Sequence, residues 1–120
     1  MQNLSIPATP DSPKVTFDTS KGLFELAGRS IMNEPENFYP PLIKWLTNYT
    51  EQPNAETQLQ IKLEYINTGS SKWLLDLFLA LQNTLNSSIL WLYPEGDDDL
   101  EEMGDEMAAL IDIPFHFKSY

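Results

Sequence analysis

Three hydroxyl groups lie within one four-residue segment, Thr68-Gly69-Ser70-Ser71, between an alternating stretch that ends at Tyr65 and an apolar run that begins at Trp73. A hydroxyl at a strand-to-helix junction is an ordinary N-cap, and any of the three can serve. One cap is enough, so the segment holds more hydroxyls than capping requires. A phosphate here would meet free backbone N–H groups and the positive end of the helix dipole, with Lys72 as a charge-assisted contact. Capping and a phosphorylation switch both remain open on the residues alone.

Other residue types that support catalysis or metal binding are sparse. The chain has no cysteine, which excludes disulfides, thiolate zinc sites and a cysteine nucleophile. The single histidine, His116, alternates outward in the last predicted strand. The acidic run from Asp97 to Glu102 lacks the spacing of a calcium loop and suits a helix N-terminus. The five glycines are dispersed and form no phosphate-binding loop. The sequence therefore predicts no enzyme, no metal site and no cofactor.

Composition and charge argue against nucleic acids and membranes as partners. The 120 residues suit one domain, and 18 acidic against 7 basic residues give a net charge of −11, which argues against nucleic acid. No apolar run approaches the ~18 residues of a membrane span. The first residues also lack the charged start and apolar stretch of a secretory signal. We expect a cytoplasmic protein without membrane contact.

The chain divides into an extended N-terminal arm, residues 1–13 with three prolines, and one domain over residues 14–120. Strands are predicted at 15–17 and 23–27, joined as a hairpin. A helical period follows from Pro35, with regular helix starting near Pro40. Its apolar stripe consists of Phe38, Leu42, Trp45, Leu46 and Tyr49.

Residues 58–65 alternate strictly and predict a strand with one buried face. Leu59, Ile61, Leu63 and Tyr65 form that face, and Gln58, Gln60, Lys62 and Glu64 form the other. A central strand covered on both faces would be apolar throughout. We therefore expect helices on one face of the sheet and water on much of the other.

The remaining pattern predicts a helix over 72–86, a strand over 89–93, a third helix and a final strand around residues 113–117, at an edge because of Pro114. Strands separated by helices make right-handed parallel crossovers. The fold class is α/β: a mostly parallel mixed sheet of about five strands, an N-terminal hairpin, and three helices mainly on one face. The expected stripes are Leu74, Leu77, Phe78, Leu81 and Leu85, then Leu100, Met103, Met107 and Leu110, with Trp73 outside its stripe and exposed.

Several short motifs over nearly the whole chain resemble the SiaC family of bacterial regulatory phosphoproteins. The most specific is Tyr65-Ile66-Asn67-Thr68 with its following serine and Lys72. The others are Leu4-x-Ile6-Pro7-x-Thr9 with Pro13, Gly28-Arg29-Ser30, Trp91-x-Tyr93 and Pro114-Phe115. The chain departs from the family pattern where Pro35-Glu36-Asn37 follows the glycine motif after a longer segment, residues 31–34.

The resemblance implies a single STAS-like domain and a partner-switching role in signal transduction. Thr68 would be phosphorylated by a serine/threonine kinase and dephosphorylated by a PP2C-type phosphatase. The unphosphorylated form would bind and activate a diguanylate cyclase, raising cyclic di-GMP and promoting biofilm formation. The turn neighbours would be Asn67, Gly69, Ser70, Ser71 and Lys72, and Trp73 is a candidate partner contact. A STAS-type anti-sigma-factor antagonist, or a structural interaction module in which Thr68 only caps a helix, stays open.

Overall fold

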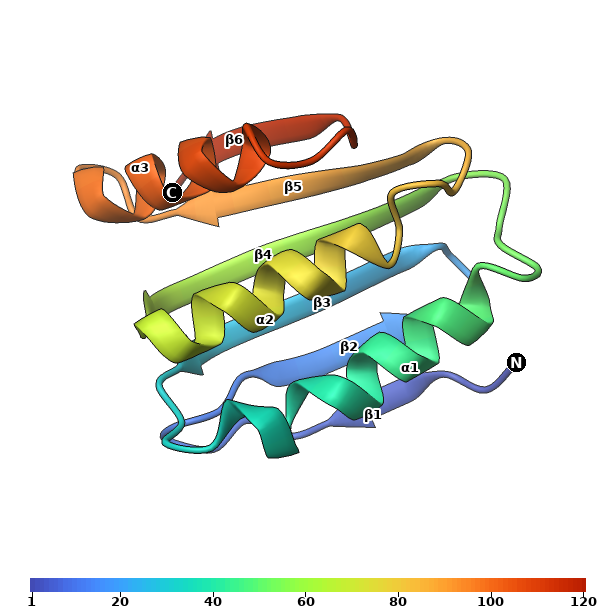
Figure 1. The fold of residues 1–120 in the computed structure, drawn as a ribbon, viewed down its shortest axis with the longest axis horizontal. Helices are drawn as coiled ribbons and strands as arrows, with labels where there is room; N and C mark the ends of the chain where they lie inside the picture. Colours follow the sequence, from blue (N-terminus) through green and yellow to red (C-terminus); the bar gives the residue numbers. More distant parts are fainter.

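A computed structural model describes residues 1–120, which form one six-stranded mixed sheet with its helices on a single face (Figure 1). The first three strands are antiparallel, and β3 to β6 run parallel. Neighbours in the sheet follow the order of the sequence, β1-β2-β3-β4-β5-β6. The strands are β1 (Leu4–Ile6), β2 (Lys14–Asp18), β3 (Leu23–Ser30), β4 (Thr57–Ile66), β5 (Ser87–Tyr93) and β6 (Phe115–Ser119).

The α/β architecture with an N-terminal hairpin is confirmed, with one additional strand. Residues 4–6 of the predicted arm pair antiparallel with β2, so the sheet has six strands where the sequence suggested about five. The last strand lies at an edge of the sheet, as Pro114 indicated. Isolated apolar residues in a proline-rich segment do not indicate a three-residue strand. The sequence pattern therefore did not predict the pairing of β1 with β2.

Three α-helices connect the parallel strands, and each crossover steps to the next strand in the same direction. The helices are α1 (Tyr39–Tyr49), α2 (Thr68–Leu79) and α3 (Asp98–Ala108), and a short 3₁₀ helix, η1 (Pro35–Asn37), precedes α1. Right-handed crossovers that all advance one way place every helix on one face of the sheet. Figure 1 shows the three helices in front of the sheet, which confirms the expected one-sided cover.

The core lies between the helices and the facing side of the sheet. On β4 the predicted alternation holds through Glu64: Leu59, Ile61 and Leu63 are buried, whereas Lys62 and Glu64 are exposed. The same period of two buries Phe24 and Leu26 on β3 and Ile89 and Trp91 on β5. The helix stripes close over them with Tyr39, Leu42, Leu46 and Tyr49 from α1 and Leu74, Leu77 and Phe78 from α2.

Tyr65 does not belong to the buried face, because the register between β3 and β4 shifts just before it. Gly28 pairs with Leu63, but the next residue of β3, Arg29, pairs with Tyr65. The extra residue on β4 is a β-bulge, which turns the following side chain to the other side of the sheet. Tyr65 is 59% exposed, and the Arg29 guanidinium lies 5.4 Å from the centre of its ring.

The predicted bounds of the second helix, residues 72–86, were wrong, and the predicted apolar stripe of the third helix extended too far. Helix α2 begins at Thr68 and ends at Leu79. Leu81 is still buried but lies in the turn after the helix, and Leu85 is 84% exposed. Helix α3 ends at Ala108, and Leu110 is 65% exposed. The apolar period continued past each helix end because the following turn still contributes buried residues, here Leu81 and Ile111.

The alternation on β4 predicts a sharp contrast between adjacent positions. Ile61→Ala should lower the free energy of unfolding by about 2–5 kcal/mol, because it opens a cavity in the core. Lys62→Ala should cost well under about 1 kcal/mol, since its side chain is exposed. Denaturant unfolding of both variants measures the difference, and equal losses would contradict the register of β4.

Candidate functional site

The junction between β4 and α2 is organised around Asn67. Its side-chain Oδ1 accepts a hydrogen bond from the Ser70 backbone N–H at 2.9 Å, and its Nδ2 donates to the Met32 carbonyl at 3.0 Å. Its own backbone N–H donates to the Ser30 carbonyl at 3.0 Å. Asn67 is therefore the N-cap of α2, and the expectation that one of the three hydroxyls caps the helix was wrong.

Thr68 is the first residue of α2 and its side chain is exposed. Its hydroxyl makes no hydrogen bond within the chain, and its carbonyl accepts a bond from the Ser71 hydroxyl at 2.8 Å. The backbone N–H groups of Thr68 and Gly69 precede the first intrahelical bond and have no acceptor among the turn and cap contacts. The exposed Thr68 hydroxyl makes no hydrogen bond within the chain, and it lies beside two free backbone N–H groups, those of Thr68 and Gly69.

Ser70 differs from Thr68 in being fully buried. Its Oγ has no hydrogen-bond partner and lies inside the fold near the Ser30–Tyr39 pair, whose hydroxyl oxygens are 2.5 Å apart. Burial raises the pKa of Tyr39 to about 12, and the Ser30 and Ser70 hydroxyls oppose part of this shift. Ser71 is half-buried and bonded to the Thr68 carbonyl. Of the three clustered hydroxyls, only that of Thr68 is exposed.

The longer loop of residues 31–37 packs against the start of α2. Pro35 is buried, and a Cβ added at Gly69 would lie 3.5 Å from the Pro35 Cγ, an ordinary van der Waals distance. Together with the bond from Asn67 to the Met32 carbonyl, the packing of η1 against α2 holds the helix start from the side of α1. The loop therefore supports the Thr68 segment rather than covering it.

Trp73 lies on the other side of α2 from Thr68. The step of five residues from Thr68 to Trp73 corresponds to about 140° of rotation around the helix axis. Trp73 is half-buried and packs against the core, whereas the sequence pattern suggested an exposed ring. Lys72, one turn after Thr68, is exposed on the Thr68 side. A role for Trp73 in binding a partner stays a prediction.

A groove of about 320 Å³ runs between α2 and α3 on the Thr68 side. Ser71, Lys72 and Leu75 line it from α2. Thr68 lies three and four residues before Ser71 and Lys72, on the same side of the helix, so it stands at the end of this groove. Four of its seven lining residues are apolar, and the set consists of Ser71, Lys72, Leu75, Met103, Glu106, Met107 and Leu110. The sequence pattern assigned Met103 and Leu110 to a core stripe; their spacing gave no sign that part of this stripe borders an open groove.

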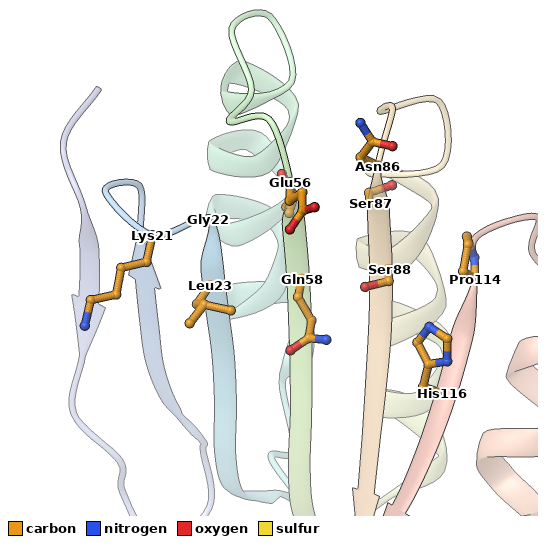
Figure 2. A pocket seen from close by; sticks show the side chains of 11 residues that line it. Lys21, Gly22, Leu23, Glu56, Gln58, Asn86, Ser87, Ser88, Pro114 and His116 are labelled. Atoms are coloured by element: carbon orange, nitrogen blue, oxygen red, sulfur yellow. The ribbon is translucent and has the colours of Figure 1, made fainter.

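A second hollow, of about 430 Å³, lies at the opposite end of the sheet (Figure 2). It is polar and includes Lys21, Gln58, Ser88 and the exposed His116, at the amino ends of the parallel strands. No three potential metal ligands come together anywhere in the chain. None of the helices has the length and apolar character needed to cross a bilayer.

Comparison with known proteins decides the family. The model of the SiaC family, described as regulatory phosphoproteins, matches residues 6–120. The chain belongs to the SiaC family. Similar chains include an uncharacterised protein of Pseudomonas aeruginosa strain UCBPP-PA14, 23% identical over 124 residues that span 100% of this chain and 98% of that protein.

Solved structures of SiaC from Pseudomonas aeruginosa share the fold of this SiaC-family chain. Apo-SiaC superposes with a TM-score of 0.88 at 23% identity, covering 98% of this chain and 99% of that one. A crystal structure of the diguanylate cyclase SiaD in complex with its activator SiaC gives the same TM-score, identity and coverage. These likenesses establish a SiaC-like fold.

The cap geometry of this SiaC-family protein separates two adjacent residues. Asn67→Ala removes the bonds to the Ser70 N–H and the Met32 carbonyl, so it should lower stability by about 1–2 kcal/mol. Thr68→Ala leaves every one of these bonds intact and should change stability by less than about 0.5 kcal/mol. Thermal or denaturant unfolding of the two variants measures this. A larger loss at Thr68 than at Asn67 would mean that Thr68 is the cap.

Proposed function

We propose that this protein is a phosphorylation-controlled partner switch that binds and activates a diguanylate cyclase when Thr68 is unphosphorylated. A kinase adds the phosphate and a PP2C-type phosphatase removes it, in the cytoplasm, so that cyclic di-GMP and biofilm formation follow the state of this residue. The observation that carries the proposal is the exposed, unbonded Thr68 hydroxyl at the end of an apolar groove. Membership of a family of regulatory phosphoproteins, and the SiaC–SiaD complex, support it.

The fold tolerates the modification. A phosphothreonine carries about −1.5 to −2 charges at neutral pH. At the first position of α2 this charge meets the positive end of the helix dipole and the free N–H groups of Thr68 and Gly69. Lys72, four residues further along the helix, supplies a cation within one turn. The cap made by Asn67 is untouched, so phosphorylation leaves the domain folded.

The phosphate instead makes the binding of a partner less favourable. A partner that packs its apolar side chains along Leu75, Met103 and Leu110 must pass close to Thr68 at the end of the same groove. Covering a phosphate there removes its water, which is unfavourable unless the partner supplies a matching cation. Glu106 already makes one wall of the groove acidic. A loss of 1.4 kcal/mol corresponds to tenfold in affinity, which is enough to release a partner bound near its dissociation constant.

The switch predicts opposite effects for two substitutions at one residue. Co-expression with the cognate kinase should add a single phosphate to Thr68. Thr68→Ala should bind the cyclase constitutively, whereas Thr68→Glu should weaken binding about tenfold or less, since a carboxylate carries less charge than a phosphate. Intact-mass and peptide mass spectrometry locate the phosphate, and calorimetry measures the affinity.

Thr47→Glu is the matched control, because Thr47 is an exposed threonine on α1, away from the groove. It should leave cyclase binding unchanged. A phosphate on Ser71, or equal affinities of folded phosphorylated and unphosphorylated protein, would rule out the Thr68 switch. Binding to an anti-sigma factor and not to the cyclase would favour the antagonist role with the same switch residue.

Two substitutions identify the face that the partner covers. Leu110 lines the groove between α2 and α3, whereas Trp73 lies on the other side of α2. Leu110→Asp, in an exposed wall of the groove, should weaken cyclase binding by about tenfold or more with little change in stability. Trp73→Ala should mainly lower stability, by about 1–3 kcal/mol, because the ring is half-buried against the core. Affinity is compared after circular dichroism confirms folding. A greater loss of affinity for Trp73→Ala would place the partner on the α1 side, with Trp73 as its contact.

A further inference from the structure

The helix-free face of the sheet differs in charge from the rest of the molecule. Side chains at alternate strand positions project from it, and Figure 2 shows Gln58, Ser88 and His116 on this side with the helices behind the strands. It carries four basic residues, Lys14, Arg29, Lys62 and Lys118, and three acidic ones, Asp18, Glu25 and Glu64. Its net charge is therefore +1. The rest of the chain holds three basic and fifteen acidic residues, a net charge of −12.

Two of the four cations on this face, Arg29 and Lys62, lie over exposed aromatic rings. The Arg29 guanidinium is 5.4 Å from the centre of the Tyr65 ring, and the Lys62 Nζ is 4.8 Å from the centre of the Tyr120 ring. Arg29 also pairs with Glu64 at 3.8 Å. Both rings are about half exposed, as is Leu23. Charges that are already paired and laid on aromatic rings are less costly to cover than free ones.

An apolar strip runs between the charged positions. Leu92 on β5 is in register with Lys62 on one side and Lys118 on the other, and Leu90 lies two residues before it on the same face. Both leucines are half-buried, and they alternate with Trp91, whose side chain points the other way, toward α3. This face of the sheet thus carries apolar side chains beside side chains of both charges.

We propose that this helix-free face is the docking surface for a second copy of the chain, packed sheet against sheet about a two-fold axis. Two copies repel each other through their acidic helix side, so only the near-neutral face allows close approach. A two-fold contact brings the same surface together from both copies, and a face with both signs of charge can pair its own cations with its own anions. Stacked sheets of this kind pack about 10 Å apart. This inference does not depend on Thr68 or on the cyclase.

The area of the helix-free face indicates what kind of dimer interface to expect. The six strands hold 38 residues. With about 4.8 Å between strands and about 3.4 Å per residue, they present roughly 600 Å² per copy. A total of roughly 1,200 Å² lies at the low end of specific interfaces, so we expect a reversible dimer.

Sedimentation velocity over a concentration series tests the dimer with two matched variants. Lys62→Glu and Lys44→Glu each change the net charge by two, but only Lys62 lies on the helix-free face, whereas Lys44 is exposed on α1. At an ionic strength of about 0.15 M, where the Debye length is about 8 Å, general repulsion is largely screened. Lys62→Glu should raise the dissociation constant about tenfold or more, and Lys44→Glu should change it less than about twofold. Lys118→Glu, two strands away, should reproduce the effect of Lys62→Glu.

Three results would overturn the inference. A wild-type chain that stays monomeric up to millimolar concentration would leave this face to a different protein. Equal weakening by Lys62→Glu and Lys44→Glu would show that total charge, and not this face, controls association. A dimer that both face variants leave intact but Leu110→Asp dissociates would place the contact on the helix side. Thermal unfolding of each variant confirms that a lost dimer is not a lost fold.

Discussion

The site depends on three of the hydrogen bonds that Asn67 makes, those to Ser30, Met32 and Ser70. One residue joins the end of β3 through the Ser30 carbonyl, the following loop through the Met32 carbonyl, and the first turn of α2 through the Ser70 N–H. An asparagine can do this because its side chain carries an acceptor and two donors. Since the capping is complete without Thr68, the Thr68 hydroxyl is free to carry a modification without loss of fold.

The surrounding contacts make this position rigid as well as exposed. Ser70 is buried beneath the first turn, beside the bonded pair of Ser30 and Tyr39, so the turn rests on the ends of both β3 and α1. Pro35 packs against it from the side. Parallel strands deliver their carboxyl ends to one edge of the sheet, where loops and helix starts form the usual binding region of α/β folds. A phosphate at Thr68 would therefore act at a fixed position, and its effect would come from charge rather than from movement of the loop.

The sequence predicted the elements better than their ends. Strict alternation over residues 58–65 located β4 and its buried face, because a period of two is set by the backbone itself. It misplaced Tyr65, since a bulge depends on the neighbouring strand and leaves no local mark. The Thr68–Ser71 segment suggested a turn before the helix because Gly and Ser are poor helix formers. In the structure it is the first turn of α2. The local Asn67 cap holds it there, together with two contacts that reach across the fold: the bond from Asn67 to the Met32 carbonyl and the burial of Ser70.

Hydroxyl crowding and family resemblance led to Thr68 as the proposed site residue, but neither predicted the groove beside it. A groove is a relation between two helices, and the stripe that contains Met103 and Leu110 has the same spacing whether its members are buried or border an opening. The two proposed surfaces also lie on opposite sides of the sheet. A phosphate at Thr68, at the start of α2, would lie on the helix side of the sheet, and the proposed dimer contact lies on the other side. The two proposals therefore concern separate surfaces of one small domain, and a variant on one surface leaves the other in place.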